Sequence, residues 1–242
     1  MNERTAIVTG AGKRVGVEIA RALLSDGWVV LAHVHNQHDE VPQGAEKVAA
    51  DLADQHCADI IFGAAAALPP VRLLINNAAR FSFDRFGEFE PGEFDRHMAV
   101  NVRAPVLLID EFARRHTGGD ALVLNLLDSK LFAPNPDFLS YSLSKHALAG
   151  LTELAARAFA DRGIRVNGIA PGLILRSNGQ SEENFEAMHT NNPLRHGVEP
   201  GDIITAVRYL IGARGVTGEV ITIDSGQRFM SLARDVQFME PK

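Results

Sequence analysis

The chain has 242 residues, of which 46% are hydrophobic and 22% charged, and its formal net charge is −6 at pH 7. This length is within the range of one α/β domain and is enough to bury a large core. The acidic balance excludes the basic footprint of a nucleic-acid-binding protein, and the single cysteine, Cys57, excludes an internal disulfide.

The first residues lead directly into an apolar β-rich run, without the apolar core of a signal peptide. No apolar run reaches the roughly 18 residues that a membrane span needs. We therefore expect a reduced, cytoplasmic protein with neither a membrane nor a nucleic-acid partner.

Short apolar runs alternate with longer helical patterns along the whole chain. The runs that predict strands are Thr5–Thr9, Trp28–Val34, Val71–Ile75, Ala121–Leu127, Arg165–Ile169 and Glu219–Ile223. The segments that predict helices are Val15–Asp26, Pro91–His116, Pro136–Asp161 and Pro200–Ile211. This alternation predicts an α/β fold, a doubly wound Rossmann fold with a parallel sheet of about seven strands. No internal linker or repeat is present, so residues 1–242 are expected to form one domain.

Two segments depart from the pattern. Sixteen residues separate Val34 from Asp51, so the helix between the second and third strands must be short or absent. The stretch Ser177–Gly197 is irregular and rich in Asn, Ser and Gly. It follows the carboxyl end of a strand, where open α/β sheets bind ligands. It is either a mobile substrate lid, over about residues 173–198, or a surface loop without a role.

A glycine-rich turn, TGAGKRVG, lies between the first strand and the first helix, over Thr9–Gly16. Gly10 allows a tight turn, and Gly16 allows the helix start to pack closely with its free N–H groups facing a pyrophosphate. A strand, such a turn and a helix in this order predict a dinucleotide site.

The end of the second strand favours NADP(H) over NAD. An acidic residue there would bind the ribose hydroxyls of NAD and repel a 2′-phosphate. The chain instead has His35 and Asn36, with no carboxylate before Asp39, and Lys13 is well placed for a phosphate.

The nearby histidines His33, His35 and His38 are also a conceivable metal cluster. They lack a neighbouring Cys or carboxylate ligand set, so we expect no metal site.

Tyr141 and Lys145 are four residues apart and therefore share one helix face. The Lys145 ammonium can stabilise the Tyr141 phenolate, so that a phenol with an ordinary pKa near 10 can exchange a proton near pH 7. Asp128 lies thirteen residues before Tyr141. Alone, the Tyr/Lys spacing also fits an ordinary amphipathic helix.

Together, over residues 5–226, these patterns resemble the short-chain dehydrogenase/reductase family. The resemblance implies that Tyr141 carries a proton, while Lys145 tunes it and grips the nicotinamide ribose. It implies that Asn101 holds a water that links the lysine to solvent. The family usually has Ser where this chain has Asp128.

The resemblance also implies a cofactor site. Asp51–Leu52 is similar to the pair that brackets the adenine, Asn77–Ala78 to the segment beside the adenine-side ribose, and Pro171–Gly172 to the segment that contacts the nicotinamide carboxamide. The full implied set is Gly10, Lys13, Arg14, Val15, Gly16, His35, Asn36, Asp51, Leu52, Asn77, Ala78, Tyr141, Lys145, Pro171 and Gly172.

Asp128 directs the substrate prediction. An ionised aspartate would repel a developing alkoxide and raise the pKa of Tyr141, so it suits protonation of a ring nitrogen better than reduction of a ketone. The chain resembles the pteridine-reductase branch, which has this Asp–Tyr–Lys arrangement. There an arginine at the position of Arg14 reaches the phosphates and the substrate, and an aromatic at the position of Phe81 stacks on the pterin. The alternatives are a surface arginine beside a polyanion and a core phenylalanine.

We therefore expect hydride transfer from NADPH to a dihydropterin, dihydromonapterin or dihydrofolate, with Arg14, Phe81, Asp128 and Tyr141 binding the substrate. One alternative is a carbonyl or imine reductase for another metabolite, and another is a non-catalytic NADPH-binding regulatory module. The resemblance implies a homotetramer built on the two long helices Pro91–His116 and Pro136–Asp161; simple core packing is the alternative.

Overall fold

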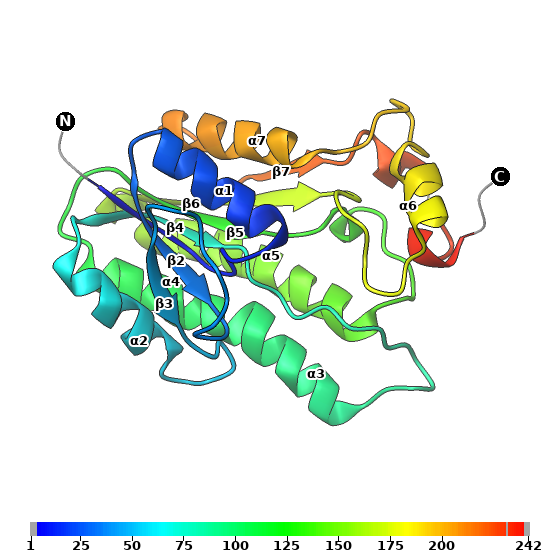
Figure 1. Ribbon diagram of the computed structural model, residues 1–242, viewed down its shortest axis with the longest axis horizontal. Helices are drawn as coiled ribbons and strands as arrows, with labels where there is room; N and C mark the ends of the chain where they lie inside the picture. The colour runs from blue at the N-terminus through cyan, green and yellow to red at the C-terminus, as the bar shows by residue number, and fades with distance from the viewer. Residues whose placement is uncertain (1–3, 231, 240–242) are drawn as a thin grey trace.

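A parallel seven-stranded sheet lies between two layers of helices (Figure 1). The computed structural model describes residues 4–230 and 232–239. The strands are β1 (Thr5–Val8), β2 (Val29–Val34), β3 (Glu46–Ala49), β4 (Val71–Asn76), β5 (Ala121–Leu126), β6 (Ile164–Pro171) and β7 (Val220–Ile223). Their spatial order, β3-β2-β1-β4-β5-β6-β7, confirms the predicted doubly wound fold.

The helices divide between the two faces of the sheet. The helices are α1 (Arg14–Ser25), α2 (Cys57–Ala64), α3 (Pro91–Met98), α4 (Ala104–Arg115), α5 (Leu139–Phe159), α6 (Glu182–His189) and α7 (Pro200–Gly212). Figure 1 shows α1 and α7 together on one face, and α2, α4 and α5 on the other. Helix α6 lies away from both layers, beside the C-terminal segment.

The strands are apolar on both sides because both faces are covered. Within β1, Ile7 belongs to the core under α2, α4 and α5, whereas Ala6 and Val8 belong to the core under α1 and α7. Leu74 of β4 and Val123 of β5 follow Ile7 in the same alternation. Near-continuous apolar runs thus supply two cores from one sheet.

The strand order reverses at β1, which pairs with both β2 and β4. Ligands of such sheets bind at the carboxyl ends of the strands beside the reversal. The predicted site residues that follow β1, β4, β5 and β6 therefore all face this one edge.

Two helix predictions were correct in place but wrong in detail. The predicted helix Pro91–His116 is α3 and α4 joined by a π-helical turn over Ala99–Arg103. The predicted helix Pro136–Asp161 begins only at Leu139, because Phe138 has a left-handed backbone with φ of 57°. It ends at Phe159 and continues as a 3₁₀ turn.

The two irregular segments had different outcomes. No helix lies between β2 and β3, as predicted. The stretch Ser177–Gly197 was wrongly predicted to be irregular, since it contains α6. Ser181 caps this helix, and its hydroxyl accepts a hydrogen bond from the Asn184 N–H at 3.1 Å. Within the described residues, no helix has the length and apolar character needed to cross a membrane.

Candidate active site

Tyr141 and Asp128 meet at the carboxyl edge of the sheet. Tyr141 lies in the first turn of α5, and its hydroxyl donates to Asp128 Oδ2 at 2.9 Å. Asp128 follows β5, and its Oδ1 accepts from the Lys130 N–H at 2.9 Å. One carboxylate oxygen is thus held by the backbone while the other is directed at the phenol.

Lys145 lies one turn further along α5 and is buried. Its ammonium donates to the Leu126 carbonyl at 2.6 Å and lies 5.5 Å from the centre of the Tyr141 ring. Burial lowers the pKa of Lys145 to about 8, against the opposing charge of Asp128. The predicted Asp–Tyr–Lys group is therefore assembled.

The electrostatics of the Asp128–Tyr141 pair differ from the sequence-based expectation in one respect. Desolvation raises the pKa of Asp128, and the charge of Lys130 lowers it. Burial and the charge of Asp128 raise the pKa of Tyr141 well above its ordinary value. The expected lowering of the Tyr141 pKa is therefore wrong, because burial and Asp128 dominate this group, while the predicted rise caused by Asp128 is present. The pair holds a proton more tightly than either group would in water.

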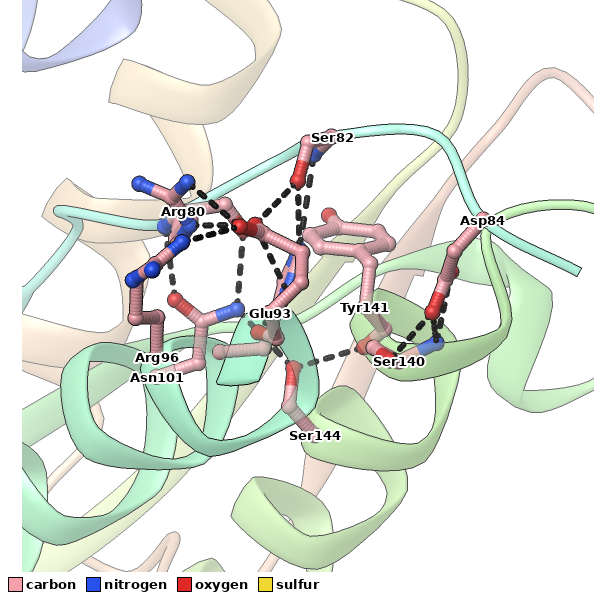
Figure 2. A network of polar contacts seen from close by, with 10 residues as sticks. Arg80, Ser82, Asp84, Glu93, Arg96, Asn101, Ser140, Tyr141 and Ser144 are labelled. Carbon is pink, nitrogen blue, oxygen red and sulfur yellow. Dashed lines mark hydrogen bonds and ion pairs between the residues drawn. The ribbon is translucent and has the colours of Figure 1, made fainter. Parts of the chain in front are cut away.

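Asn101 lies in the π-helical turn and joins the segment after β4 to α5 (Figure 2). Its side chain accepts from the Arg80 N–H at 2.7 Å and donates to the Arg80 carbonyl at 3.0 Å. It also donates to the Ser144 hydroxyl at 2.9 Å, one residue before Lys145. These contacts place Asn101 beside α5; its role in holding a water stays a prediction.

A second polar network, which the sequence did not indicate, surrounds Glu93 in the first turn of α3 (Figure 2). Its carboxylate accepts from Arg80 Nη2 at 2.8 Å, from Arg96 Nη1 at 3.0 Å and from the Ser82 hydroxyl at 2.5 Å. The Arg80 hydrogen bond is the main cause that lowers the pKa of Glu93 to about 2. The network fixes the chain between β4 and α3, on which Phe81 lies.

Asp84, which no sequence pattern indicated, caps α5. It is buried, and its carboxylate accepts from the Ser140 N–H at 2.9 Å and from the Ser140 hydroxyl. The cap satisfies an N–H at the start of α5, and its negative charge suits that helix end. Because the cap comes from a residue 56 positions away, no local sequence signal could reveal it.

Phe81 lies beside Tyr141, as the substrate prediction requires. Its ring stacks on Phe138 with centroids 4.3 Å apart and meets the Tyr141 ring edge-on at 4.7 Å. Phe81 is 41% exposed, so it is not a core phenylalanine, and its stacking on a substrate stays a prediction.

The glycine turn has the close packing that its motif predicts. Gly10 has φ of 66°, a conformation that favours glycine. A Cβ on Gly16 would lie 2.2 Å from the Gly10 carbonyl oxygen. Asn77 braces the turn by donating to the Thr9 carbonyl at 2.8 Å, and Ala78 lies against Gly10. Lys13 occupies the N-cap position of α1, but its side chain makes no capping hydrogen bond. The N–H groups of the first turn therefore suit an anionic pyrophosphate.

Arg14 connects this turn to the segment that follows β6. Its guanidinium donates to the Arg176 carbonyl at 2.9 Å and to the Leu175 carbonyl at 3.3 Å. Its charge acts to lower the pKa of Tyr141, although burial dominates that group. Arg14 is exposed but hydrogen-bonded to the segment after β6, and its contact with phosphates or substrate stays a prediction. Its neighbour Val15 is half-buried at the start of α1.

The region after β2 contains a carboxylate, that of Asp39, which lies closer to Asn36 than its place in the sequence suggested. His35 and Asn36 are exposed there, and Asp39 accepts from the Asn36 N–H at 3.1 Å. His35 lies 3.9 Å from Asp51, the neighbour of buried Leu52.

His33 has a different place from the other histidines. It is buried, accepts from the Gly10 N–H at 3.2 Å and lies 3.0 Å from the Ala50 carbonyl, and burial lowers its pKa. It braces the glycine turn. Among the described residues, no group of three or more His, Cys, Asp or Glu side chains is arranged to hold a metal ion.

The nicotinamide end of the predicted cofactor site lies where β6 ends. Pro171 pairs with Ile223 of β7, and the Gly172 N–H donates to the Ile223 carbonyl at 2.8 Å. A Cβ on Gly172 would lie 3.0 Å from the Asp224 Cβ, so the backbone passes closely here. The structure thus brings the Asp128–Tyr141–Lys145 group, the glycine turn and the ends of β4 and β6 to one edge of the sheet, and the roles of these residues in binding stay predictions.

Comparisons with known proteins bear on the family and the fold. Residues 10–228 match the model of a family described as enoyl-(acyl carrier protein) reductase. A crystal structure of FolM alternative dihydrofolate reductase 1 from Brucella canis, complexed with NADP, is similar with a TM-score of 0.88 and 36% identity, over 94% of each chain. L-xylulose reductase of Bos taurus is 30% identical over 92% of this chain and 96% of its own. Carbonyl reductase [NADPH] 2 of Sus scrofa is 29% identical over 91% and 95%.

Proposed function

Since the chain belongs to the short-chain dehydrogenase/reductase family of oxidoreductases, we propose that it is an NADPH-dependent reductase of a pteridine-type substrate: a dihydropterin, dihydromonapterin or dihydrofolate. The observation that carries the proposal is the hydrogen bond between Tyr141 and Asp128. The likeness to the Brucella canis dihydrofolate reductase supports it.

NADPH, when bound, would supply the hydride. The first turn of α1 suits its pyrophosphate, and Lys13 suits its 2′-phosphate. Asp39 acts in the opposite direction, because its charge disfavours a 2′-phosphate near Asn36. The preference for NADPH is therefore a balance between these charges.

The Asp128–Tyr141 pair is suited to donate a proton to a ring nitrogen. The hydride would reach the carbon of a ring C=N bond, and the Tyr141 hydroxyl would deliver a proton to the nitrogen. Asp128 would accept ring N–H groups and share the proton with Tyr141. Lys145 would hold the nicotinamide ribose, and Phe81 would stack against the flat substrate.

Reduction of a carbonyl is the second candidate, because relatives named L-xylulose reductase and carbonyl reductase cover most of the chain. In that reaction the group thirteen residues before the tyrosine would need to donate to a developing alkoxide. Asp128 instead accepts the hydrogen bond of the Tyr141 hydroxyl, which weighs against this candidate.

The test is a panel of dihydropterins, dihydrofolate, imines and ketones incubated with NADPH, with Tyr141→Phe as the inactive control. We expect turnover of at least one pteridine. Turnover of ketones alone would support the second candidate. NADPH binding without any turnover would support a regulatory module.

We also propose a homotetramer. Leu143 and Leu154 on α5, and Val106 on α4, are apolar side chains between 42% and 67% exposed, so these helices retain an uncovered apolar face. Light scattering at micromolar concentration would show a species of about four chains, and a monomer would refute the proposal.

A further inference from the structure

The C-terminal segment, residues 234–239, docks against the start of the catalytic helix. Arg234 donates to both oxygens of Asp137, at 2.7 and 2.9 Å, and the Asp235 N–H donates to the same carboxylate at 2.8 Å. Asp137 is only 2% exposed and directly precedes Phe138. The segment is therefore fixed to the residues that set the position of α5.

The same segment reaches the turn that holds Asp128. Asp235 Oδ2 lies 2.5 Å from the Lys130 ammonium, and the two side chains are only 11% and 13% exposed. The Lys130 N–H is the group that binds Asp128, and the Lys130 ammonium lies 4.7 Å from the centre of the Phe138 ring. Lys130 thus contacts Asp128 with its backbone and the C-terminal segment with its side chain.

Further contacts join this segment to the substrate side. Phe238 packs against Phe83, with centroids 5.1 Å apart. Gln237 donates to the Asn178 carbonyl at 3.0 Å, and Asn184 of α6 donates to the Met239 carbonyl at 2.6 Å. Figure 1 shows this C-terminal segment beside α6.

We propose that Asp235 and Lys130 are positioning residues for the Asp128–Tyr141 pair: the C-terminal segment supplies a carboxylate that holds the Lys130 ammonium beside the turn and so sets the charge around the proton donor. The inference rests on the proposed function for the role of the pair in proton donation. Neither residue belongs to the set implied by the family pattern.

The two charges act on the pair in opposite directions. The charge of Lys130 lowers the pKa of Asp128, and the charge of Asp235 raises the pKa of Tyr141. Removal of the Asp235 charge should therefore make the pair more acidic, and removal of the Lys130 charge should make it more basic. The other charged groups that act on the pair, on Lys130 or on Asp235 are Arg14, Asp137, Lys145 and Arg234.

The first measurement is the pH dependence of kcat/KM for pterin reduction by the full chain. Donation requires a proton on the pair, so activity falls as the pH rises through the pKa of the pair. In Asp235→Asn this fall should move to lower pH, and in Lys130→Met to higher pH, each by roughly half a unit or more. The matched control is Asp26→Asn, which breaks a carboxylate–Arg208 pair between α1 and α7 and should leave the midpoint unchanged.

The second measurement does not depend on any substrate. The chain has two tyrosines, and Tyr209 is 56% exposed on α7. With ¹³Cζ-labelled tyrosine, the Tyr141 resonance should titrate with Asp128, because the two are hydrogen-bonded. Its midpoint should move to lower pH in Asp235→Asn and to higher pH in Lys130→Met. Asp235→Glu, which keeps the charge, should have the wild-type midpoint.

Unchanged midpoints in both variants would overturn the inference, even where kcat falls, because loosening of the segment alone changes rates without moving a titration. An Asp235→Glu variant that behaves like Asp235→Asn would also overturn it. Opposite shifts of the NMR midpoints without any turnover of pterins would support the inference while refuting the proposed function.

Discussion

The cofactor side and the substrate side of the site are built in different ways. On the cofactor side, glycines and main-chain groups within a few residues of each other form the surface, as at Gly10 and Gly16. On the substrate side, charged and aromatic side chains come together from distant parts of the chain. Asp84 caps α5 across 56 residues, and Arg234 binds Asp137 across 97. The cofactor side therefore has no room for added atoms, whereas the substrate side depends on charges.

The largest expected effect is on the proton donor, the Asp128–Tyr141 pair. A substitution there should lower pterin reduction strongly and leave NADPH binding nearly unchanged. Asp128→Ser should lower kcat for pterin reduction by about 10²–10⁴, since positioned proton transfer is lost, while the Kd of NADPH changes little. Tyr141→Phe should be comparably damaging. The double variant should be little worse than either single one, because the two groups act as a unit.

Steady-state kinetics and NADPH fluorescence titration measure both quantities. Asp128→Ser is also expected to gain activity on simple ketones, because a serine hydroxyl donates to a carbonyl oxygen. Unchanged pterin turnover in this variant would make the aspartate incidental.

The same contrast explains which features the sequence could predict. The glycine turn, the Tyr141–Lys145 spacing and the apolar strands are local patterns, and the structure has them where they were expected. The short strand β3 begins with two exposed polar residues, Glu46 and Lys47, so no apolar run predicted it.

Long-range side-chain contacts could not be predicted in this way. The start of α5 depends on the left-handed backbone of Phe138, which the cap from Asp84 and the contacts of Asp137 stabilise. The rise in the pKa of Tyr141 depends on burial, which only the folded chain defines. Helix α6 is short and polar, and the Asn, Ser and Gly residues around it obscured its pattern.

The next effect tests the packing of the cofactor side. Gly16→Ala places a Cβ 2.2 Å from the Gly10 carbonyl oxygen, so the turn must move. We expect the Kd of NADPH to rise by about 100-fold, or about 2.7 kcal/mol. The matched control is Gly63→Ala in α2, where a Cβ meets no atom within 4 Å. Equal affinity in both variants would show that the turn is not tightly packed.

A smaller effect concerns the choice between the two cofactors, where the cofactor side does depend on charge. We expect kcat/KM to be at least about tenfold higher with NADPH than with NADH, or about 1.4 kcal/mol. Asn36→Asp should move the preference toward NADH, because a second carboxylate beside Asp39 repels a 2′-phosphate. Equal use of both cofactors by the wild-type protein would refute the preference.

The smallest effect concerns Glu93, whose removal should lower the stability of the substrate side without changing the Kd of NADPH. Because the pKa of Glu93 is lowered from 4.5 to about 2, mainly by Arg80, its contribution to folding stability is full above pH 4.5 and is lost as the pH falls through about 2. Glu93→Gln should therefore lower the Tm at pH 7 by a few degrees. This corresponds to about 1–2 kcal/mol at roughly 2–4 °C per kcal/mol, after allowance for solvent screening of the partly exposed Arg80.

The difference in Tm between wild type and variant should shrink between pH 4.5 and 2, and the Kd of NADPH should stay unchanged because Glu93 braces only the chain between β4 and α3. Glu153→Gln is the matched control, since its ion pair with Arg157 on α5 is exposed and contributes little. Differential scanning fluorimetry across this pH range measures both variants. A loss of stability that is undiminished at pH 2 would show that Glu93 acts through its shape. A weaker Kd would show that the two sides of the site are mechanically coupled through α3.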